Sequence, residues 1–319
     1  MSQECRTLDY FDRSQPQHLR NARQAHALVV VNHNIRLYYD CHDSHEIDHS
    51  AANEVDCYFK RSYSSAAVPD SLKAKVFPLG LTYPLYSADI DPFERQRLAA
   101  FEGDLTSTLH PPRPTPENMS APVDDDTSGI LFMTRVWDPF DDPDRSKEKI
   151  SERIRVNDMR ARCIELLRER FGPSCQSGLA HTAYAVEHYP SVLLDDKDSA
   201  AKENYIQLLR THAVCVATTG LHGSIGWRMG EYVAFSRAIV SERLNYEVPG
   251  NFKAGMNYLE FSEPQECVEA VDGLLANPAL RNTMMRANHQ YYHTAVKPDQ
   301  LVGRTLAIGL SARSDPRKR

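Results

Sequence analysis

The sequence predicts an α/β protein of two domains. Its 319 residues are enough for two domains of ordinary size. From residue 129 onward, short apolar runs alternate with segments of helical spacing, the order that builds a parallel sheet covered by helices. Residues 106–128 are rich in proline, serine and aspartate and lack an apolar period, which predicts an exposed linker or long loop. We therefore expect an N-terminal domain over 1–105 and a C-terminal domain over 129–319.

Before the linker, short apolar runs predict the strands of a small α/β domain. The first run, ALVVV, has the composition of a buried strand, and Asn32–Asn34 separates it from the second. The polar stretch Asp40–Ser50 predicts a loop or a short helix. The predicted strands are Ala27–Val31, Ile35–Tyr39, Val55–Phe59 and a fourth that starts at Lys75–Phe77.

After the linker, the alternation of strands and helices is clearer. Strands are predicted at Gly129–Met133, Leu179–Tyr184, Ala213–Ala217, Ala238–Ser241 and Tyr258–Phe261. Helices are predicted at Asn157–Arg170, Ala201–Arg210, from about Gly230, at Pro264–Ala276 and at Pro278–Tyr292. Ligands of such parallel sheets bind at the carboxyl ends of strands, and polar loops follow two of these ends, at Met133 and Ala217.

Composition excludes several classes of protein. Apolar residues make up 41% of the chain and charged residues 25%, as in globular proteins. A net charge of -6 argues against general binding of nucleic acid or of membrane surfaces. The sequence contains no apolar run long enough for a membrane span and no secretory signal at its start. Seven scattered cysteines without CxxC spacing favour reduced thiols, and we expect a cytoplasmic protein.

The most informative motif is the glycine-rich turn Thr218–Glu231, TTGLHGSIGWRMGE. A predicted strand precedes it and a predicted helix follows, an arrangement that presents backbone N–H groups to an anion. In this turn Ser224 is a neutral donor, and Arg228 is a cation that can hold phosphate with two hydrogen bonds. Glu231 can accept hydrogen bonds from a sugar hydroxyl. The motif therefore predicts a site for a phosphorylated, hydroxyl-rich ligand such as a sugar nucleotide.

Other residues near this turn extend the predicted site. Arg135 follows the strand Gly129–Met133 and can converge on the same anion, although it can instead pair with Asp138. Arg228 can likewise pair with Glu231. Large aromatics beside a turn usually close a core, so packing is the favoured role of the neighbouring tryptophan, Trp227.

Several stretches resemble the GT-B-fold glycosyltransferases, in which two Rossmann-like domains face each other across a cleft. The resemblance covers roughly residues 27–305 and is strongest in the C-terminal half. The turn is also similar to that of protein O-glucosyltransferase-type domains, where a serine and an arginine hold the diphosphate. The resembling stretches are LHGSIGWRMGEYVAFSRAIVSERLNYEVPG, GMNYLEF, MMRANHQYY, ILFMTRVWDP, YYDCHDSHE, VDCYFKRSY and VFPLGLTY.

The resemblance implies that the C-terminal domain holds a nucleotide-sugar donor. Transfer builds negative charge on the leaving diphosphate, which backbone N–H groups, a helix N-terminus and arginines can stabilise without a metal or a cofactor. Asn257 can lie near the donor, although stabilising its own turn is the commoner role of such an asparagine. The predicted donor-site residues are Arg135, His222, Gly223, Ser224, Arg228, Glu231 and Asn257.

The sequence departs from the family in two ways. Retaining members often carry two glutamates with seven residues between them, but the position that follows Glu231 at this offset is Ile239. This absence favours an inverting reaction. The N-terminal domain, on the acceptor side, is also short, which keeps open a non-catalytic protein that binds a nucleotide-sugar.

An inverting transfer needs a general base for the acceptor hydroxyl. Asp43 with His42 or His45 can form such a base and its orienting partner, although Asp40 and Asp43 can instead cap a helix. The cluster of histidines and aspartates over residues 40–49 also raises a metal-dependent hydrolase as the weaker alternative, but its spacing matches no known zinc motif. We expect a metal-independent glycosyltransferase with His42 and Asp43 as its catalytic residues and an unknown acceptor.

Overall fold

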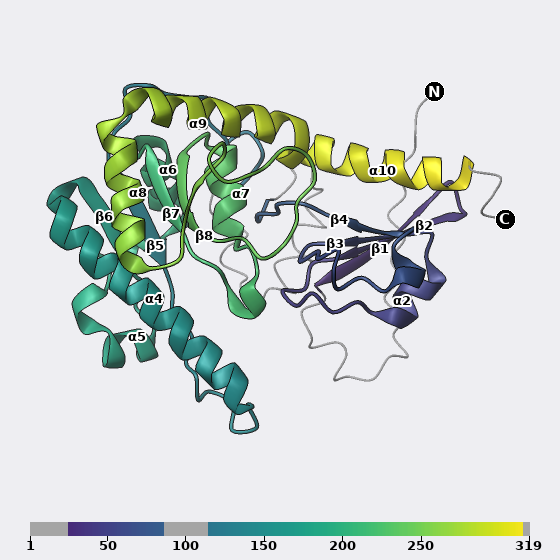
Figure 1. Cartoon of the computed structure of the whole chain (residues 1–319), viewed down its shortest axis with the longest axis horizontal. Helices are drawn as coiled ribbons and strands as arrows, with labels where there is room; N and C mark the ends of the chain where they lie inside the picture. The colour runs from purple at the N-terminus through teal and green to yellow at the C-terminus, as the bar shows by residue number, and fades with distance from the viewer. Residues whose placement is uncertain (1–24, 86–113, 315–319) are drawn as a thin grey trace.

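The computed structural model describes residues 25–85 and 114–314 of the chain. It contains two α/β units, one built on a four-stranded sheet and the other on a five-stranded sheet. Figure 1 shows the two units side by side, with the smaller N-terminal unit at the right. The predicted fold class, an α/β protein with a reduced N-terminal domain, is confirmed. The boundary at 105 lies outside the described residues, and the division into domains stays a prediction.

The N-terminal sheet has the order β1-β2-β3-β4. Strands β1 and β2 form an antiparallel hairpin, and β2, β3 and β4 run parallel. Asn32 and His33 make the hairpin turn with positive φ angles of 51° and 62°. The elements are β1 His26–Val31, β2 Ile35–Asp40, α2 His49–Glu54, β3 Cys57–Lys60 and β4 Val76–Pro78.

Strand β1 is exposed, so the prediction of a buried strand at Ala27–Val31 is wrong. Leu28 is 55% exposed and Val29 is 39% exposed. The physical reason is position, because β1 lies at the edge of the sheet and pairs with β2 alone. An apolar run predicts a strand, but the neighbours that cover it are set by the tertiary structure.

The C-terminal sheet is parallel throughout and has the order β6-β5-β7-β8-β9. This is a doubly wound order in which the chain moves to one side of β5 and then returns to the other. The strands are β5 Ile130–Thr134, β6 Cys175–Leu179, β7 Val214–Ala217, β8 Ala238–Glu242 and β9 Leu259–Phe261.

Helices cover both faces of this sheet. Helices α4 and α8 pack against one face, and α6 and α7 pack against the other, while α9 contributes to both cores. None of the helices in the two described ranges is both long and apolar enough to cross a membrane. The helices are α4 Lys147–Phe171, α5 Ala183–His188, α6 Lys202–Thr211, α7 Trp227–Ala234, α8 Pro264–Ala276 and α9 Pro278–Tyr291.

Three predicted elements change in the structure. The strand predicted at Leu179–Tyr184 is wrong, because β6 ends at Leu179 and the Thr182 side chain caps α5. Helix α4 begins at Lys147 rather than at Asn157, since Ser146 caps its N-terminus and its first turns lie outside the apolar period. Helix α7 begins at Trp227, earlier than predicted.

The described part of the predicted linker lies against the C-terminal unit. Met119 is fully buried in the core that contains α6 and α7. The backbone N–H of Ala121 donates to the carbonyl of Ala234 at the end of α7. From residue 114 onward, the predicted linker or long loop forms no helix or strand before β5 and packs against the C-terminal unit at these points.

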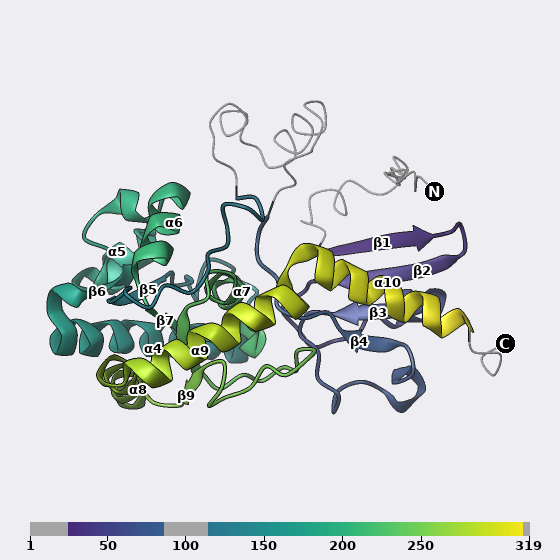
Figure 2. The ribbon, with the colours of Figure 1, turned by 90° about the horizontal axis from the view of Figure 1, so that it is seen from above.

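The last helix, α10 (Pro298–Ser314), returns to the N-terminal sheet. It follows α9 through a π-helical turn, and Figures 1 and 2 show it crossing from one unit to the other. The Tyr39 hydroxyl lies 2.8 Å from Oγ1 of Thr305, and Arg304 donates to the carbonyl of Pro78. The sequence prediction counted this segment with the C-terminal domain, but its contacts place it against β2 and β3.

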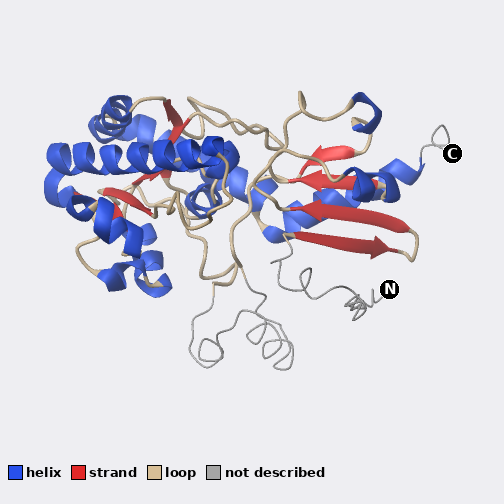
Figure 3. Ribbon diagram, turned by 90° about the horizontal axis from the view of Figure 1, so that it is seen from below, coloured by secondary structure: helices blue, strands red, loops and turns tan. Residues whose placement is uncertain are grey.

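The carboxyl ends of the two sets of parallel strands face each other. In Figures 2 and 3, β1 runs away from the C-terminal unit, whereas β2, β3 and β4, which are parallel to one another, run toward it. Directly after β3, Arg61 donates to the carbonyl of Ile225 in the glycine-rich turn at 2.7 Å. A side chain at Gly230 of α7 would meet the carbonyl of Thr82, which follows β4. The loops of both sheets therefore meet along one seam.

Candidate functional site

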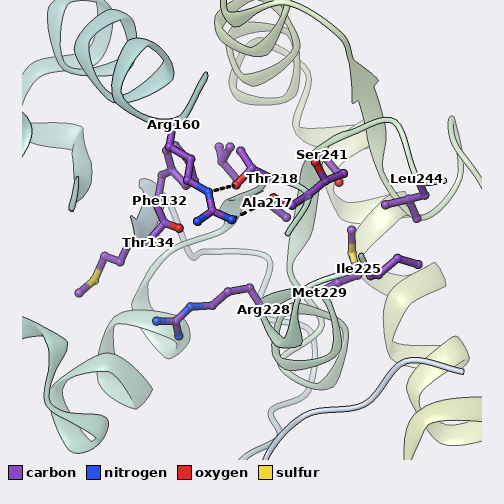
Figure 4. A pocket seen from close by; sticks show the side chains of 14 residues that line it. Phe132, Thr134, Arg160, Ala217, Thr218, Ile225, Arg228, Met229, Ser241 and Leu244 are labelled. Atoms are coloured by element: carbon purple, nitrogen blue, oxygen red, sulfur yellow. Dashed lines mark hydrogen bonds between the residues drawn. The ribbon is translucent and has the colours of Figure 1, made fainter. Parts of the chain in front are cut away.

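A pocket opens where strands β5 and β7 separate. These strands pair only at Ile130–Val214 and Leu131–Cys215, and beyond this point they diverge. The order of the sheet reverses here, which is where doubly wound sheets bind ligands. The enclosed part of the hollow has a volume of about 60 Å³, and its mouth opens to solvent. Its walls come from the ends of β5 and β7, from the N-terminal turn of α7, and from Arg160 of α4 (Figure 4).

The glycine-rich turn forms between β7 and α7, in the predicted order of strand, turn and helix. Gly223 has a positive φ of 64°, and a side chain there would collide with Asn245. Gly226 is the N-cap of α7 and lines the pocket. The N-terminus of α7 therefore faces the pocket, where the helix dipole favours an anion.

Arg228 lines the pocket from the first turn of α7. Its Nη1 lies 2.9 Å from Oε2 of Glu231, and its guanidinium stacks on the ring of Tyr205. The Arg228 side chain is 39% exposed, so it can still meet a ligand. The alternative pairing of Arg228 with Glu231 is thus present in the structure, and it leaves one side of the guanidinium toward the pocket.

The sequence predicts Glu231 as an acceptor for a sugar hydroxyl, whereas in the structure its carboxylate is buried and paired with side chains. Its side chain is 3% exposed, Oε1 lies 2.7 Å from Nζ of Lys202, and Oε2 accepts from Tyr205 as well as from Arg228. Burial opposes ionisation, but Arg228 and Lys202 hold the pKa of Glu231 below its ordinary value. The carboxylate therefore positions two cations beside the pocket.

Arg135 lies at the same edge of the sheet but not in the pocket wall. Its side chain is exposed, and its guanidinium lies over the ring of Trp137. The alternative ion pair with Asp138 is absent among the contacts of the described residues. What Arg135 contributes to the pocket is its carbonyl, which accepts from Arg160.

Three predicted donor residues shape the turn and do not line the pocket. His222 has a positive φ of 60°, its backbone N–H donates to Glu152, and its side chain is exposed. Ser224 is 2% exposed and fills the space beside Gly220. The carbonyl of Gly223 accepts from Asn245. The wall of the pocket resumes after them, at Ile225.

Asn257 is buried in a structural role, and its contact with the donor stays a prediction. It is 1% exposed, and its Oδ1 accepts from the backbone N–H of Lys253. Its Nδ2 donates to Oδ1 of Asn288 on α9. Both ends of the amide are used to hold the turn before β9, as the alternative interpretation expected.

The position of Trp227 differs from the packing role that the sequence favoured. It is the first residue of α7 and is 55% exposed, so it does not close a core. Its neighbours Gly226 and Arg228 both line the pocket. The indole thus stands at the surface beside the pocket.

Sequence reasoning missed Arg160, which is the most buried cation of the pocket. It lies on α4, is 5% exposed, and stacks on the ring of Trp137 at 4.4 Å. Burial lowers its pKa to about 9. A polar residue within the apolar period of α4 was the available signal, but its direction depends on the packing of α4 against the sheet.

The histidine–aspartate cluster of the N-terminal unit forms a different pair from the predicted one. Nδ1 of His42 lies 2.8 Å from Oδ1 of Asp40, whereas Asp43 forms an ion pair with Arg61. Asp40 is 3% exposed and also binds Lys60 at 2.7 Å. The orienting carboxylate of His42 is therefore Asp40, since Asp43 is engaged elsewhere.

The weaker alternative, a metal site in residues 40–49, finds no support in the geometry. Over the described ranges, no three potential metal ligands converge. Asp43 faces Arg61, and Asp48 caps α2 by accepting from the backbone N–H of Ala51. The carboxylates of this loop thus have partners of their own.

Comparisons with known proteins identify the second unit. The model of a family described as "Glycosyl transferase-like" matches residues 140–306, more than half of the chain. This match contains α4, the glycine-rich turn and α7, but not the N-terminal sheet. A search of the curated proteins finds no match.

Solved structures of glycosyltransferases are similar at low sequence identity. The C-terminal domain of a glycosyl transferase group 1 family protein from Francisella tularensis is 12% identical, with a TM-score of 0.37 over 57% of this chain and 98% of that one. Alr3699/HepE of Anabaena, in complex with UDP-glucose, is 11% identical, with a TM-score of 0.45 over 88% and 72%. Sucrose-phosphate synthase of Thermosynechococcus elongatus is 14% identical, with a TM-score of 0.38 over 83% and 59%.

Proposed function

We propose that this chain, which belongs to the glycosyl transferase-like family, moves a sugar from a nucleotide diphosphate sugar to the hydroxyl of an acceptor. Family membership makes it a glycosyltransferase. The donor class, the acceptor and the stereochemistry are parts of the proposal. The observation that carries the donor class is the pocket between β5 and β7, where a helix N-terminus and two arginines meet.

The pocket suits a leaving diphosphate. Glycosyl transfer breaks the bond between the sugar and the diphosphate, so negative charge grows on the diphosphate oxygens. Arg228 and the N-terminus of α7 can stabilise this charge from the pocket wall, and Glu231 keeps Lys202 beside Arg228. We therefore propose a reaction that uses these cations and needs no cofactor, with the nucleotide-sugar as donor substrate. Turnover that persists in a chelator would support this part, and loss that returns with a divalent metal would contradict it.

We propose His42 as the general base of an inverting, in-line transfer. Asp40 accepts at Nδ1 of the imidazole, which leaves Nε2 to take the proton of the acceptor hydroxyl. The His42 side chain is 53% exposed, and its loop is tied to the glycine-rich turn through Arg61. Asp43 helps to hold this loop through the same arginine.

The direct test is binding and turnover with a panel of UDP, GDP, ADP, TDP and CMP sugars. Binding of one donor raises the midpoint of thermal unfolding, and transfer or slow hydrolysis releases the nucleotide. Binding without turnover by any donor would favour the second candidate, a non-catalytic nucleotide-sugar-binding protein. The small size of the N-terminal sheet is the observation that favours this candidate. Failure of every donor to bind would refute the proposal. Absence of nucleic-acid partners and a cytoplasmic location stay predictions.

Arg228→Ala should weaken the binding of the nucleoside diphosphate by about 1–3 kcal/mol, because it removes a charge-assisted bond. The matched control is Arg162→Ala, which removes another arginine paired with a glutamate three residues later, on the exposed side of α4. Isothermal titration calorimetry measures both. Unchanged affinity in a folded Arg228→Ala variant would remove Arg228 from the site.

A further inference from the structure

Arg160 bridges the gap in which the pocket opens. From α4, its Nη1 donates to the carbonyl of Arg135 after β5 at 2.6 Å, and its Nη2 donates to the carbonyl of Thr219 after β7 at 2.9 Å. Its Nε donates to Oγ1 of Thr218 at 2.9 Å (Figure 4). The guanidinium thus holds together two strand ends that no longer pair with each other.

The charge of Arg160 has no carboxylate in direct contact. Its three acceptors are neutral oxygens, and its face lies on the ring of Trp137. Within the described part of the chain, the nearby acid Glu242 binds Thr219 and forms no ion pair with Arg160. Burying a cation is costly, and desolvation lowers the pKa of Arg160 although the charge of the nearby Glu242 acts to raise it.

The guanidinium also keeps hydrogen-bonding capacity toward the pocket. An arginine has five N–H groups, of which the contacts above use three, one on each nitrogen. One N–H on each terminal nitrogen is left, and Arg160 is part of the pocket wall, as is Arg228. Two N–H groups in one plane match two oxygens of a phosphate.

We propose that Arg160 binds the diphosphate of the donor directly and thereby gains an anion in direct contact, which the neutral oxygens around it do not provide. This inference rests on the proposed function and adds a named ligand to it. The same side chain links the two strand ends through their carbonyls and places its charge between them. Diphosphate binding then neutralises the most buried cation of the pocket.

The rival explanation is that Arg160 has only a structural role, in which it binds backbone carbonyls. Arg168, two turns later on α4, offers the matched control. It also donates to three carbonyls, those of Ser177, Ser191 and Leu193, but it is not part of the pocket wall. Arg168→Met therefore removes a comparable set of hydrogen bonds to carbonyls without removing charge from the pocket.

The experiment measures the affinity of the full chain for UDP, GDP and ADP by calorimetry. For each nucleotide that binds, the affinity for its nucleoside is measured by competition. Arg160→Met should bind the diphosphate about tenfold or more weakly and the nucleoside within about twofold of wild type. Arg168→Met should keep both affinities. If Arg160→Met does not fold, Arg160→Gln, which is neutral but can still donate to a carbonyl, should show the same selective loss.

The possible outcomes separate the two proposals. If the wild type binds no nucleoside diphosphate, the proposed function fails. If the wild type binds and the Arg160 variant binds the diphosphate equally well, the inference fails while the function stands. Equal weakening of diphosphate and nucleoside would mean that the pocket has collapsed, and would overturn the direct contact. Selective loss of the diphosphate supports it.

Discussion

Asp40 is a buried carboxylate that its neighbours keep ionised. It accepts from Nζ of Lys60, from the hydroxyl of Tyr58 and from the ring and backbone of His42. Lys60 is itself only 1% exposed. Burial alone would raise the pKa of Asp40, but the hydrogen bonds from Lys60 and Tyr58 hold it below its ordinary value.

Asp40→Asn should lower the free energy of unfolding by about 3–5 kcal/mol at neutral pH, because it leaves Lys60 buried without its counter-charge. Since the folded pKa of Asp40 is depressed, its contribution is present above the unfolded value of about 4 and is lost as the pH falls through the folded value. Urea unfolding at a series of pH values measures this. The variant should therefore lose less stability below about pH 4 than the wild type does.

Asp43→Asn is the control for this change, because Asp43 is 48% exposed and its ion pair with Arg61 lies near the surface. It should cost no more than about 1 kcal/mol. Parallel curves of stability against pH for wild type and Asp40→Asn would contradict the account of Asp40.

At the scale of elements, the β1–β2 hairpin carries local strain. Three residues connect β1 and β2, and the first two of them, Asn32 and His33, have left-handed backbone angles in a β-turn closed by the hydrogen bond from Asn34 N–H to the carbonyl of Val31. Asparagine and histidine occur in this region more often than most residues, but only glycine adopts it without a steric cost. The edge strand therefore depends on a turn that is not optimal at its second position.

His33→Gly should raise the free energy of unfolding by about 0.5–1 kcal/mol, because it relieves the left-handed strain and creates the favoured Asn-Gly pair. Asn34→Gly is the control, since Asn34 is the next exposed residue and has no positive φ. That change should lower the free energy of unfolding by up to about 1 kcal/mol. Chemical denaturation measures the free energy of unfolding of both variants. A change of the same sign in both would refute the backbone strain at His33.

At the scale of the whole molecule, two close approaches of helices add to the hydrogen bonds that hold the units together. Helix α10 packs on the N-terminal sheet, and α7 approaches the segment that follows β4. An added Cβ at Gly230 would lie 2.9 Å from the carbonyl oxygen of Thr82 and 3.3 Å from Cβ of Tyr83. A glycine in the middle of α7 is thus required by the close approach of the two units.

Gly230→Ala should lower the free energy of unfolding by about 1–3 kcal/mol, although alanine is the better helix former, because the backbone of Thr82 must move. The matched control is Gly273→Ala in α8, where an added Cβ meets nothing within 4 Å. That variant should gain up to about 1 kcal/mol. Thermal and urea unfolding measure both changes, and a gain in stability for Gly230→Ala would show that the units pack less closely than described.

The sequence predicted an element well where the signal for it lies in neighbouring residues. The helices α8 and α9 begin at their prolines, as expected, since proline suits the first turn of a helix. Pro298 offers the same signal for α10, but the surface that stabilises this helix is a sheet formed more than 200 residues earlier in the chain. The exposure of β1 likewise depends on its place in the sheet.

The sequence by itself determined the alternation of strands and helices, the glycine-rich turn between β7 and α7, and the resemblance to glycosyltransferases, because each depends on residues close together in the chain. Only the tertiary structure decided which charges meet. It paired Arg228 with Glu231 and His42 with Asp40, turned Asn257 inward, and brought Arg160 into the gap between β5 and β7. The physical reason is that ion pairing and burial depend on distance and solvent exclusion in space, which spacing along the chain does not specify.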